Sequence, residues 1–353
     1  MTVLHSTEPA TVHLSLWARV EGLTVAEVEE ALYDERSLVK QLAMRRTLFV
    51  FPRDLLPAAW GSASARVART EWARVTKDVV AAGLAVDGDA WLRTATDAVL
   101  GALADGPLGT AELRERLPEL AGTVEISPGT TWGGVVQIAP RVMTQLGAQG
   151  RIVRGDNAGH WRISRPAWTL MESWLGESPV ALDERLGYAE LVRRWLWTFG
   201  PGTSTDLQWW LGSTKAAVTR ALADCEAVAV GLDGDQGWLL PDDLDEVASV
   251  APWAALLPVL DPTVMGWKQR DFFLGPHAGA LFDRNGNAGT TAWWDGRVVG
   301  CWVQDDAGAV HLRLLEDVPA AGRRALQSEA DRLGDWLGGV RVGTVYGSPA
   351  MKA

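Results

Sequence analysis

The chain has 353 residues, of which 47% are hydrophobic, and a formal net charge of −11. This length exceeds what one hydrophobic core usually serves, so the sequence predicts two or more cooperating units. No uncharged apolar stretch reaches about 18 residues, and the opening MTVLHSTEPA lacks the basic and apolar segments of a signal peptide. These features exclude membrane insertion and secretion, and we expect a cytoplasmic protein.

The reactive side chains argue against metal and nucleotide chemistry. Cys225 and Cys301 are the only cysteines, and each lies among apolar neighbours, so we expect buried thiols rather than a zinc site or a disulfide. Among the histidines, only His5 lies at a metal-ligand spacing from a carboxylate, that of Glu8. The turns GPLGT and GPGTS lack the Lys-Ser or Lys-Thr ending of a phosphate-binding loop. We therefore expect no cofactor and no metal.

Positive charge gathers in one segment of this acidic chain. Between Arg36 and Lys77, nine Lys and Arg residues are opposed only by Asp54 and Glu71. Affinity for a polyanion depends on such local clustering rather than on the total charge. The segment therefore indicates a polyanionic partner.

The first predicted unit spans residues 1–85. A helix from Thr24 to Leu32 begins with a capping box formed by Thr24 and Glu27, a second helix begins at Ser37, and the extended segment TLFVFP follows. Pro52 breaks this strand, and a long helix comes next. Its polar side carries four cations, which are Arg66, Arg69, Arg74 and Lys77.

Two further units, 86–180 and 181–250, repeat one pattern. Each has an apolar-periodic helix, a Gly-Pro turn, a short capped helix, a third helix and two strands joined by a turn. The strand segments are RIVRGDNAGHWRI and AVAVGLDGDQGWLL. Ser213 is the candidate N-cap of the third helix in unit 181–250. Trp132 lies near the start of the third helix in unit 86–180. This order of elements is the plan of a winged helix-turn-helix.

Residues 251–353 change to short strands and Gly-rich turns. Turns at Asp295-Gly296 and Asp306-Ala307-Gly308 join consecutive antiparallel strands, and a final helix runs from Ala320 to Leu337. The predicted class is therefore α+β, with tandem winged helix-turn-helix units followed by a small β-rich, barrel-like C-terminal domain.

Three segments carry a resemblance to a known family. They are LVKQLAMRRTLFVFPRDL (residues 38–55), LLPVLDPTVMGWKQRD (256–271) and DGRVVG (295–300). The chain resembles, over nearly its whole length, a bacterial winged-helix DNA-binding family related to DNA glycosylases that excise alkylated or crosslinked purines. The resemblance implies tandem winged helices that bind duplex DNA, followed by a β-rich domain.

The resemblance also implies a catalytic segment. Glycosylase branches of the family carry Leu-Gln-x-Gln or Leu-Gln-x-Asp where this chain has Leu-His-Ser-Thr-Glu-Pro, starting at Leu4. His5 would act as a base, Thr7 would replace an amide or carboxylate, and Glu8 would stabilise an oxocarbenium-like centre. The alternative is a non-catalytic branch in which His5 and Thr7 are polar surface or capping residues. Because family members carry a helical stretch before this motif, we expect the true start to lie upstream.

The main interpretation is a monomeric winged-helix protein that binds double-stranded or damaged DNA through phosphate contacts, at the nucleoid when bound. The candidate contacts are Arg45, Arg46, Arg66, Arg69, Arg74 and Lys77, with Arg154, His160 and Arg162 in the first predicted wing. The first alternative is a DNA glycosylase that removes alkylated or crosslinked purines. The second is a transcription regulator or a protein-interaction scaffold.

Overall fold

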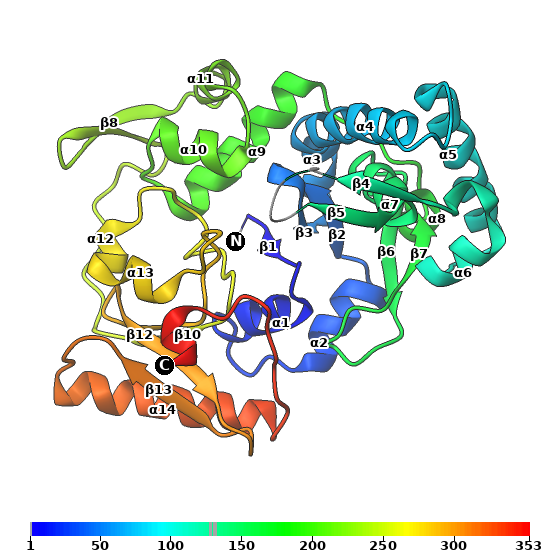
Figure 1. Cartoon of the computed structure of the whole chain (residues 1–353). Coiled ribbons are helices and arrows are strands. Elements are labelled where there is room, and N and C mark those ends of the chain that lie inside the picture. Colours follow the sequence, from blue (N-terminus) through cyan, green and yellow to red (C-terminus); the bar gives the residue numbers. More distant parts are fainter. Residues whose placement is uncertain (1, 127–128, 130–132) are drawn as a thin grey trace. The chain divides into compact units, whose positions relative to one another are not determined.

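The computed structural model describes residues 2–126, 129 and 133–353, and Trp132 lies outside them. The chain forms two compact units, and its course is drawn in Figure 1. Unit 1 comprises Met1–Glu30, Trp161–Ile163 and Val192–Ala353, and unit 2 comprises Ala31–His160 and Ser164–Leu191. Both contain helices and antiparallel strands, which confirms the α+β class. The finer division at residues 85, 180 and 250 stays a prediction.

Unit 2 combines packed helices with antiparallel strand pairs. Its strands are β2 (Leu38–Ala43), β3 (Thr47–Pro52), β4 (Thr123–Ile126), β5 (Gly134–Gln137), β6 (Ile152–Asn157) and β7 (Pro166–Leu170). Its helices are α3 (Leu56–Gly61), α4 (Ala63–Ala81), α5 (Gly88–Ala104), α6 (Thr110–Arg116), α7 (Ala139–Ala148) and α8 (Met171–Leu175). The long helix α9 (Glu184–Phe199) begins in unit 2 and ends in unit 1.

The core of unit 2 forms where the apolar stripes of α4, α5 and α7 meet. Val75 and Val79 of α4, Val99 of α5 and Leu146 of α7 are all fully buried in it. Their spacing follows the 3.6-residue period of a helix. Burial of each such side chain stabilises the fold by about 1.5–3 kcal/mol. This packing fixes α4, the helix that carries the predicted cations.

The helix predicted from Ser37 is wrong, because the segment is strand β2. It pairs with β3 from Leu38 opposite Pro52 to Ala43 opposite Thr47. Its burial alternates residue by residue, as a strand with one buried face requires. The polar Gln41 occupies one of the buried positions, so the apolar pattern alone does not reveal the strand.

Unit 1 contains the two ends of the chain. Its helices are α1 (Pro9–Trp17), α2 (Val25–Glu29), α10 (Ser204–Leu211), α11 (Lys215–Asp224), α12 (Asp271–Leu274), α13 (Ala278–Leu281), α14 (Ala320–Leu337) and α15 (Pro349–Lys352). Its strands are β1 (Leu4–His5), β8 (Val228–Leu232), β9 (Asp235–Leu239), β10 (Ala254–Leu257), β11 (Thr291–Trp294), β12 (Arg297–Gln304) and β13 (Val310–Leu314). In the part of the chain that the structure describes, no helix is long and apolar enough to cross a membrane.

The C-terminal strands form an open antiparallel sheet in the order β10-β11-β12-β13. Helix α14 packs on it, and its bounds are those predicted. The turns at Asp295-Gly296 and Asp306–Gly308 join neighbouring strands, as predicted. Among the described residues β10 and β13 remain edges, so the sheet does not close into the expected barrel.

Helices α9, α10 and α11 precede the hairpin of β8 and β9, in the order predicted for the last repeat. Helix α10 begins with a capping box in which the Thr203 hydroxyl accepts from Asp206 N, and the Asp206 carboxylate accepts from Thr203 N. Thr214 rather than Ser213 caps α11. The order of elements agrees with the prediction, and the winged-helix assignment stays a proposal.

The first predicted wing departs from its expected course. Its second strand is β7, and the expected strand around Trp161 is absent among the described residues. Trp161 is instead buried in unit 1, with its ring centroid 5.0 Å from that of His13 and 5.7 Å from that of Trp336. Anchoring of this large aromatic side chain makes its neighbour Arg162 part of unit 1 as well.

We predict that Gly61→Ala destabilises the protein by about 2 kcal/mol or more, because a β-carbon there would lie 2.0 Å from the carbonyl oxygen of Leu182. The matched control is Gly101→Ala in α5, where nothing lies within 4 Å of the added carbon. This control should stabilise the protein by about 0.5–1 kcal/mol. Urea unfolding of both variants measures the two effects, and equal effects would contradict the packing described.

Candidate functional site

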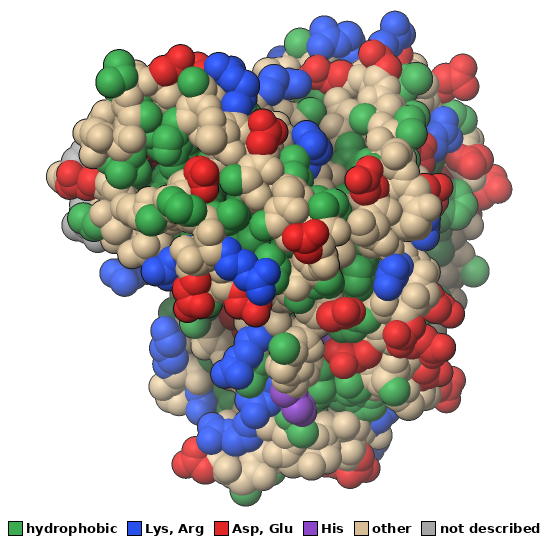
Figure 2. Space-filling model, turned by 90° about the vertical axis from the view of Figure 1, so that its right-hand side faces the viewer, with side chains coloured by type: hydrophobic (Ala, Val, Ile, Leu, Met, Phe, Trp, Pro, Cys, Tyr) green, Lys and Arg blue, Asp and Glu red, His purple; other side chains and the backbone are tan. Residues whose placement is uncertain are grey.

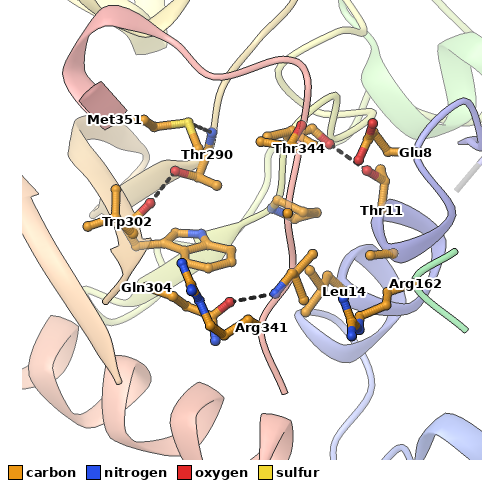
Figure 3. A pocket seen from close by; sticks show the side chains of 16 residues that line it. Glu8, Thr11, Leu14, Arg162, Thr290, Trp302, Gln304, Arg341, Thr344 and Met351 are labelled. Carbon is orange, nitrogen blue, oxygen red and sulfur yellow. Dashed lines mark hydrogen bonds between the residues drawn. The ribbon is translucent and has the colours of Figure 1, made fainter. Parts of the chain in front are cut away.

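A cavity of about 400 Å³ lies within unit 1, between α1, the C-terminal sheet and the segment after α14 (Figure 3). Leu14 of α1, Trp302 of β12 and Met351 of α15 contribute apolar surface. Arg162 and Arg341 also line it. Its size and mixed lining are typical of a small-molecule or nucleobase site.

Several polar groups in the cavity wall already have partners within the wall. The amide nitrogen of Gln304 donates to the carbonyl oxygens of Gly308 and Val340, and its oxygen accepts from Val342 N. The indole N–H of Trp302 donates to the carbonyl oxygen of Leu257 at 2.9 Å. These bonds fix the shape of the wall. Glu8, Arg162 and Arg341 are the charged side chains of the lining, and they are the groups that can attract a polar or charged ligand.

Glu8 is the carboxylate of this cavity. It occupies the position before α1, where Pro9 starts the helix. Burial raises the pKa of the Glu8 carboxyl, and hydrogen bonds from the backbone of Val345 and the side chain of Thr344 oppose that rise. A partly desolvated carboxyl beside a cavity is a frequent feature of functional sites.

The other two predicted catalytic residues lie on the same short segment but outside the cavity lining. His5 ends β1, is 8% exposed, and its Nδ1 accepts a hydrogen bond from Thr7 N at 3.5 Å. Thr7 is exposed. The segment from His5 to Glu8 therefore brings a nearly buried imidazole, an exposed hydroxyl and a cavity-lining carboxylate together within four residues.

Helix α1, which follows this segment, is bound to the C-terminal half of unit 1 by the buried carboxylate of Asp261. Arg19 donates to both carboxylate oxygens, at 2.7 and 2.9 Å, and Ser15 donates to one of them at 2.9 Å. Thr263 N also donates to Asp261 at 2.9 Å. Asp261 is 0% exposed, so its charge needs all of these donors.

The sequence analysis missed this network, although α1 carries a signal for it. Thr11 and Ser15 of α1, and Arg19 in the turn just after it, are spaced four residues apart, which places them along one side of the helix and its end. Thr11 donates to the carbonyl oxygen of Val259 at 2.9 Å, and the other two reach Asp261. A polar stripe on an otherwise apolar buried helix indicates a specific partner.

Among the predicted DNA contacts, Arg45 and Arg46 are exposed in the turn between β2 and β3. Arg46 lies 3.4 Å from the buried carboxylate of Glu71, and Arg74 of α4 lies 2.8 Å from it. Glu71 thus brings the turn and α4 together. On the face drawn in Figure 2, Lys and Arg side chains are interspersed with Asp and Glu.

The four predicted cations of α4 are all exposed. At 100° per residue, Arg66, Arg69, Arg74 and Lys77 fall within an arc of roughly 140°. Arg69 also lies 3.6 Å from Glu184, and both side chains of this pair are largely exposed. Helix α4 therefore presents one cationic face.

The three predicted wing residues lie in different surroundings. Arg154 lies within β6 with its guanidinium 5.3 Å from the ring centre of Trp168, and burial lowers its pKa. His160 is exposed, and Arg162 lines the cavity of unit 1. The structure therefore does not place Arg154, His160 and Arg162 in one wing.

The described residues contain no group of three or more His, Cys, Asp or Glu side chains that could hold a metal ion. Cys225 and Cys301 are buried free thiols, as predicted. Burial raises the pKa of Cys301 to about 11 and also raises that of Cys225. Neither thiol is therefore ionised near neutral pH.

Comparison with known proteins gives two matches. A family model described as DNA glycosylase AlkZ-like matches residues 1–336. The solved structure of Streptomyces sahachiroi DNA glycosylase AlkZ is similar, with a TM-score of 0.73 and 20% sequence identity, over 96% of this chain and 90% of that one. At this identity the structural match bears on the fold alone. No curated protein matches the sequence.

The family match corrects the main interpretation of the sequence. A winged-helix protein that only binds DNA, and equally a transcription regulator or scaffold, is wrong as the leading function, because the matched family is one of DNA glycosylases. The finding supports the first alternative instead.

We predict that Asp261→Asn lowers the free energy of unfolding by about 3 kcal/mol, because it leaves Arg19 without its anionic partner in a partly buried place. Asp317→Asn is the control, since its pair with Arg323 is exposed and should contribute less than about 1 kcal/mol. Chemical denaturation of both variants tests this. Similar losses in the two variants would contradict the stabilising role given to the buried Asp261 carboxylate.

Proposed function

This chain belongs to the DNA glycosylase AlkZ-like family, and on that premise we propose that it hydrolyses the N-glycosidic bond of modified purines in double-stranded DNA. The match over residues 1–336 carries the proposal, and the family implies DNA as the partner. The lesion class follows the resemblance of the sequence to glycosylases of alkylated or crosslinked purines. As a bacterial repair enzyme it would act as a monomer in the cytoplasm, at the nucleoid when bound.

The proposed reaction uses the segment from His5 to Glu8. A water molecule attacks the anomeric carbon, its proton passes to the neutral imidazole of His5, and the bond to the purine breaks with its electron pair on the base. The hydrogen bond that His5 Nδ1 accepts from Thr7 N is 3.5 Å long, so it is weak and can be exchanged for one from water. The Thr7 hydroxyl would hold this water.

Glu8 would supply negative charge near the developing cation at the sugar. Electrostatic stabilisation of this kind gains strength where water is partly excluded, and Glu8 is half-buried beside the cavity. The cavity would receive the departing base, because a purine with a substituent is smaller than about 400 Å³. Leu14 and Trp302 offer apolar contacts to such a base.

Duplex binding would rest on phosphate contacts from Arg45, Arg46 and the cationic face of α4, within a tandem winged-helix arrangement. The element order of α9, α10, α11, β8 and β9 supports that arrangement. His160 and Arg162 are exposed and remain candidate phosphate contacts. Arg154 is half-buried over the ring of Trp168, and it too remains a candidate phosphate contact.

The deciding experiment incubates the purified protein with duplexes that carry a purine N7-methyl or a bulky N7 adduct, beside an undamaged duplex. Alkali-labile cleavage at the lesion should appear, and His5→Ala should slow it by about 100-fold or more, as loss of a general base does. His311→Ala, at an exposed histidine paired with Asp305, should leave the rate unchanged. Binding of every duplex without cleavage would reject the proposed function.

Glu8→Gln separates stability from activity. Burial raises the pKa of Glu8, so the ionised form at pH 7 is destabilised in the folded protein, and the stabilising protonated form is lost as pH rises through that pKa. The variant should therefore have a higher Tm than the wild type at pH 7, no advantage at pH values below the ordinary glutamate pKa of 4.5, and slower excision. A lower Tm at pH 7 would contradict this account.

A further inference from the structure

A second concave site lies within unit 2, as a groove of about 530 Å³ lined by α3, α4 and the turn that follows α7. Its lining includes two indoles, Trp60 and Trp72, and two guanidinium groups, Arg69 and Arg151. The groove shares Arg69 with the cationic face of α4 and adds aromatic surface, which phosphate contacts alone do not need.

The indole N–H groups are already engaged within the protein. Trp60 Nε1 donates to Gln41 Oε1 at 2.9 Å, and Trp72 Nε1 donates to the carboxylate of Asp89. These bonds hold both rings in place and leave no indole N–H for a ligand. Trp60 is only 8% exposed, so the half-buried Trp72 offers most of the apolar ring surface. The matching ligand therefore has a flat face that can stack.

The turn that brings Arg151 to the groove depends on a glycine. Gly150 has φ of +68°, and a β-carbon at this position would lie 2.5 Å from Trp60 Nε1. Only glycine combines this left-handed backbone with such close approach to the indole. The fold therefore holds the exposed residue Arg151 directly beside Trp60.

Arg69 supplies the second positive charge. Its pair with Glu184 has an N–O distance of 3.6 Å, with 61% and 56% of the two side chains exposed. Such a pair contributes at most about 1 kcal/mol, so Arg69 can exchange Glu184 for a phosphate at low cost. Arg66 and Lys77 continue the positive charge along α4.

We propose that this groove binds a DNA nucleotide whose base has left the helical stack, with the base against Trp72 and the adjoining phosphates on Arg69 and Arg151. Aromatic rings beside guanidinium groups bind unpaired nucleotides by stacking and charge together. A base that stays within a duplex cannot reach such a groove. The site is thus a second DNA contact, independent of the excision chemistry proposed for unit 1.

The test measures dissociation constants by fluorescence anisotropy for three labelled DNAs of equal strand length. They are a perfect duplex, a duplex with one bulged adenine, and a single strand. The wild type should prefer the bulged duplex. Trp72→Ala should weaken binding of the bulged duplex and the single strand by about 5-fold or more, the effect of losing one stacked base, and should spare the perfect duplex.

Three controls keep the result interpretable. Trp72→Phe retains a ring but cannot donate to Asp89, so it should keep the preference if stacking is the cause. Arg151→Ala should weaken binding of all three DNAs and lower the salt slope by about one. Trp197→Ala, at an exposed tryptophan of α9 outside the groove, should change nothing. No preference in the wild type, or equal losses on all three DNAs in Trp72→Ala, would overturn the proposal.

Discussion

A fully buried carboxylate, that of Asp261, imposes the strictest physical constraint on unit 1. An anion without solvent must be matched by donors, and here they come from its own loop, from Ser15 of α1 and from Arg19, which follows α1 and lies 242 positions away in sequence. Because Ser15 lies on α1 and Arg19 lies in the turn that directly follows it, the charge can be satisfied only if α1 keeps its place and direction. The segment from His5 to Glu8 precedes α1 directly, so the same network fixes the start of the proposed active site.

At Glu8, unlike Asp261, the hydrogen bonds do not offset the cost of burying the charge. Its carboxyl is half-buried and accepts hydrogen bonds from Thr344 and Val345. Burial outweighs these bonds, so the ionised form is less stable here than in water. For the proposed active site, the Asp261 network would supply the rigid support and Glu8 the partly desolvated, reactive group. The segment after α14 completes the cavity and supplies both donors to Glu8.

The sequence correctly predicts the structural features that a few adjacent residues determine. The capping box at Thr24, the turns of the C-terminal sheet and the bounds of α14 all follow from a few adjacent residues. Features that depend on distant partners were missed. β2 was read as a helix because the buried Gln41, bonded to Trp60 and Gly147, interrupts its apolar alternation.

In the candidate site too, the sequence indicates single residues but not the contacts that bring distant residues together. The sequence singled out Glu8 and Arg162 for separate reasons, and no spacing rule brings these two residues to one cavity. Trp161, anchored beside His13 and Trp336, makes Arg162 part of unit 1. Asp261 could be sought only by asking what the stripe of Thr11, Ser15 and Arg19 contacts.

The charge distribution bears on how an acidic chain of net charge −11 binds DNA. Salt screens charges beyond about 8–10 Å, so the distant acids matter less than the immediate partners of each cation. Arg46 and Arg74 already share Glu71, and Arg69 is near Glu184. These cations exchange one anion for another on binding, which yields less free energy than contacts made by unpaired cations. Contacts other than charge therefore gain weight, and for an unstacked nucleotide the proposed groove beside this cationic face would supply one at Trp72.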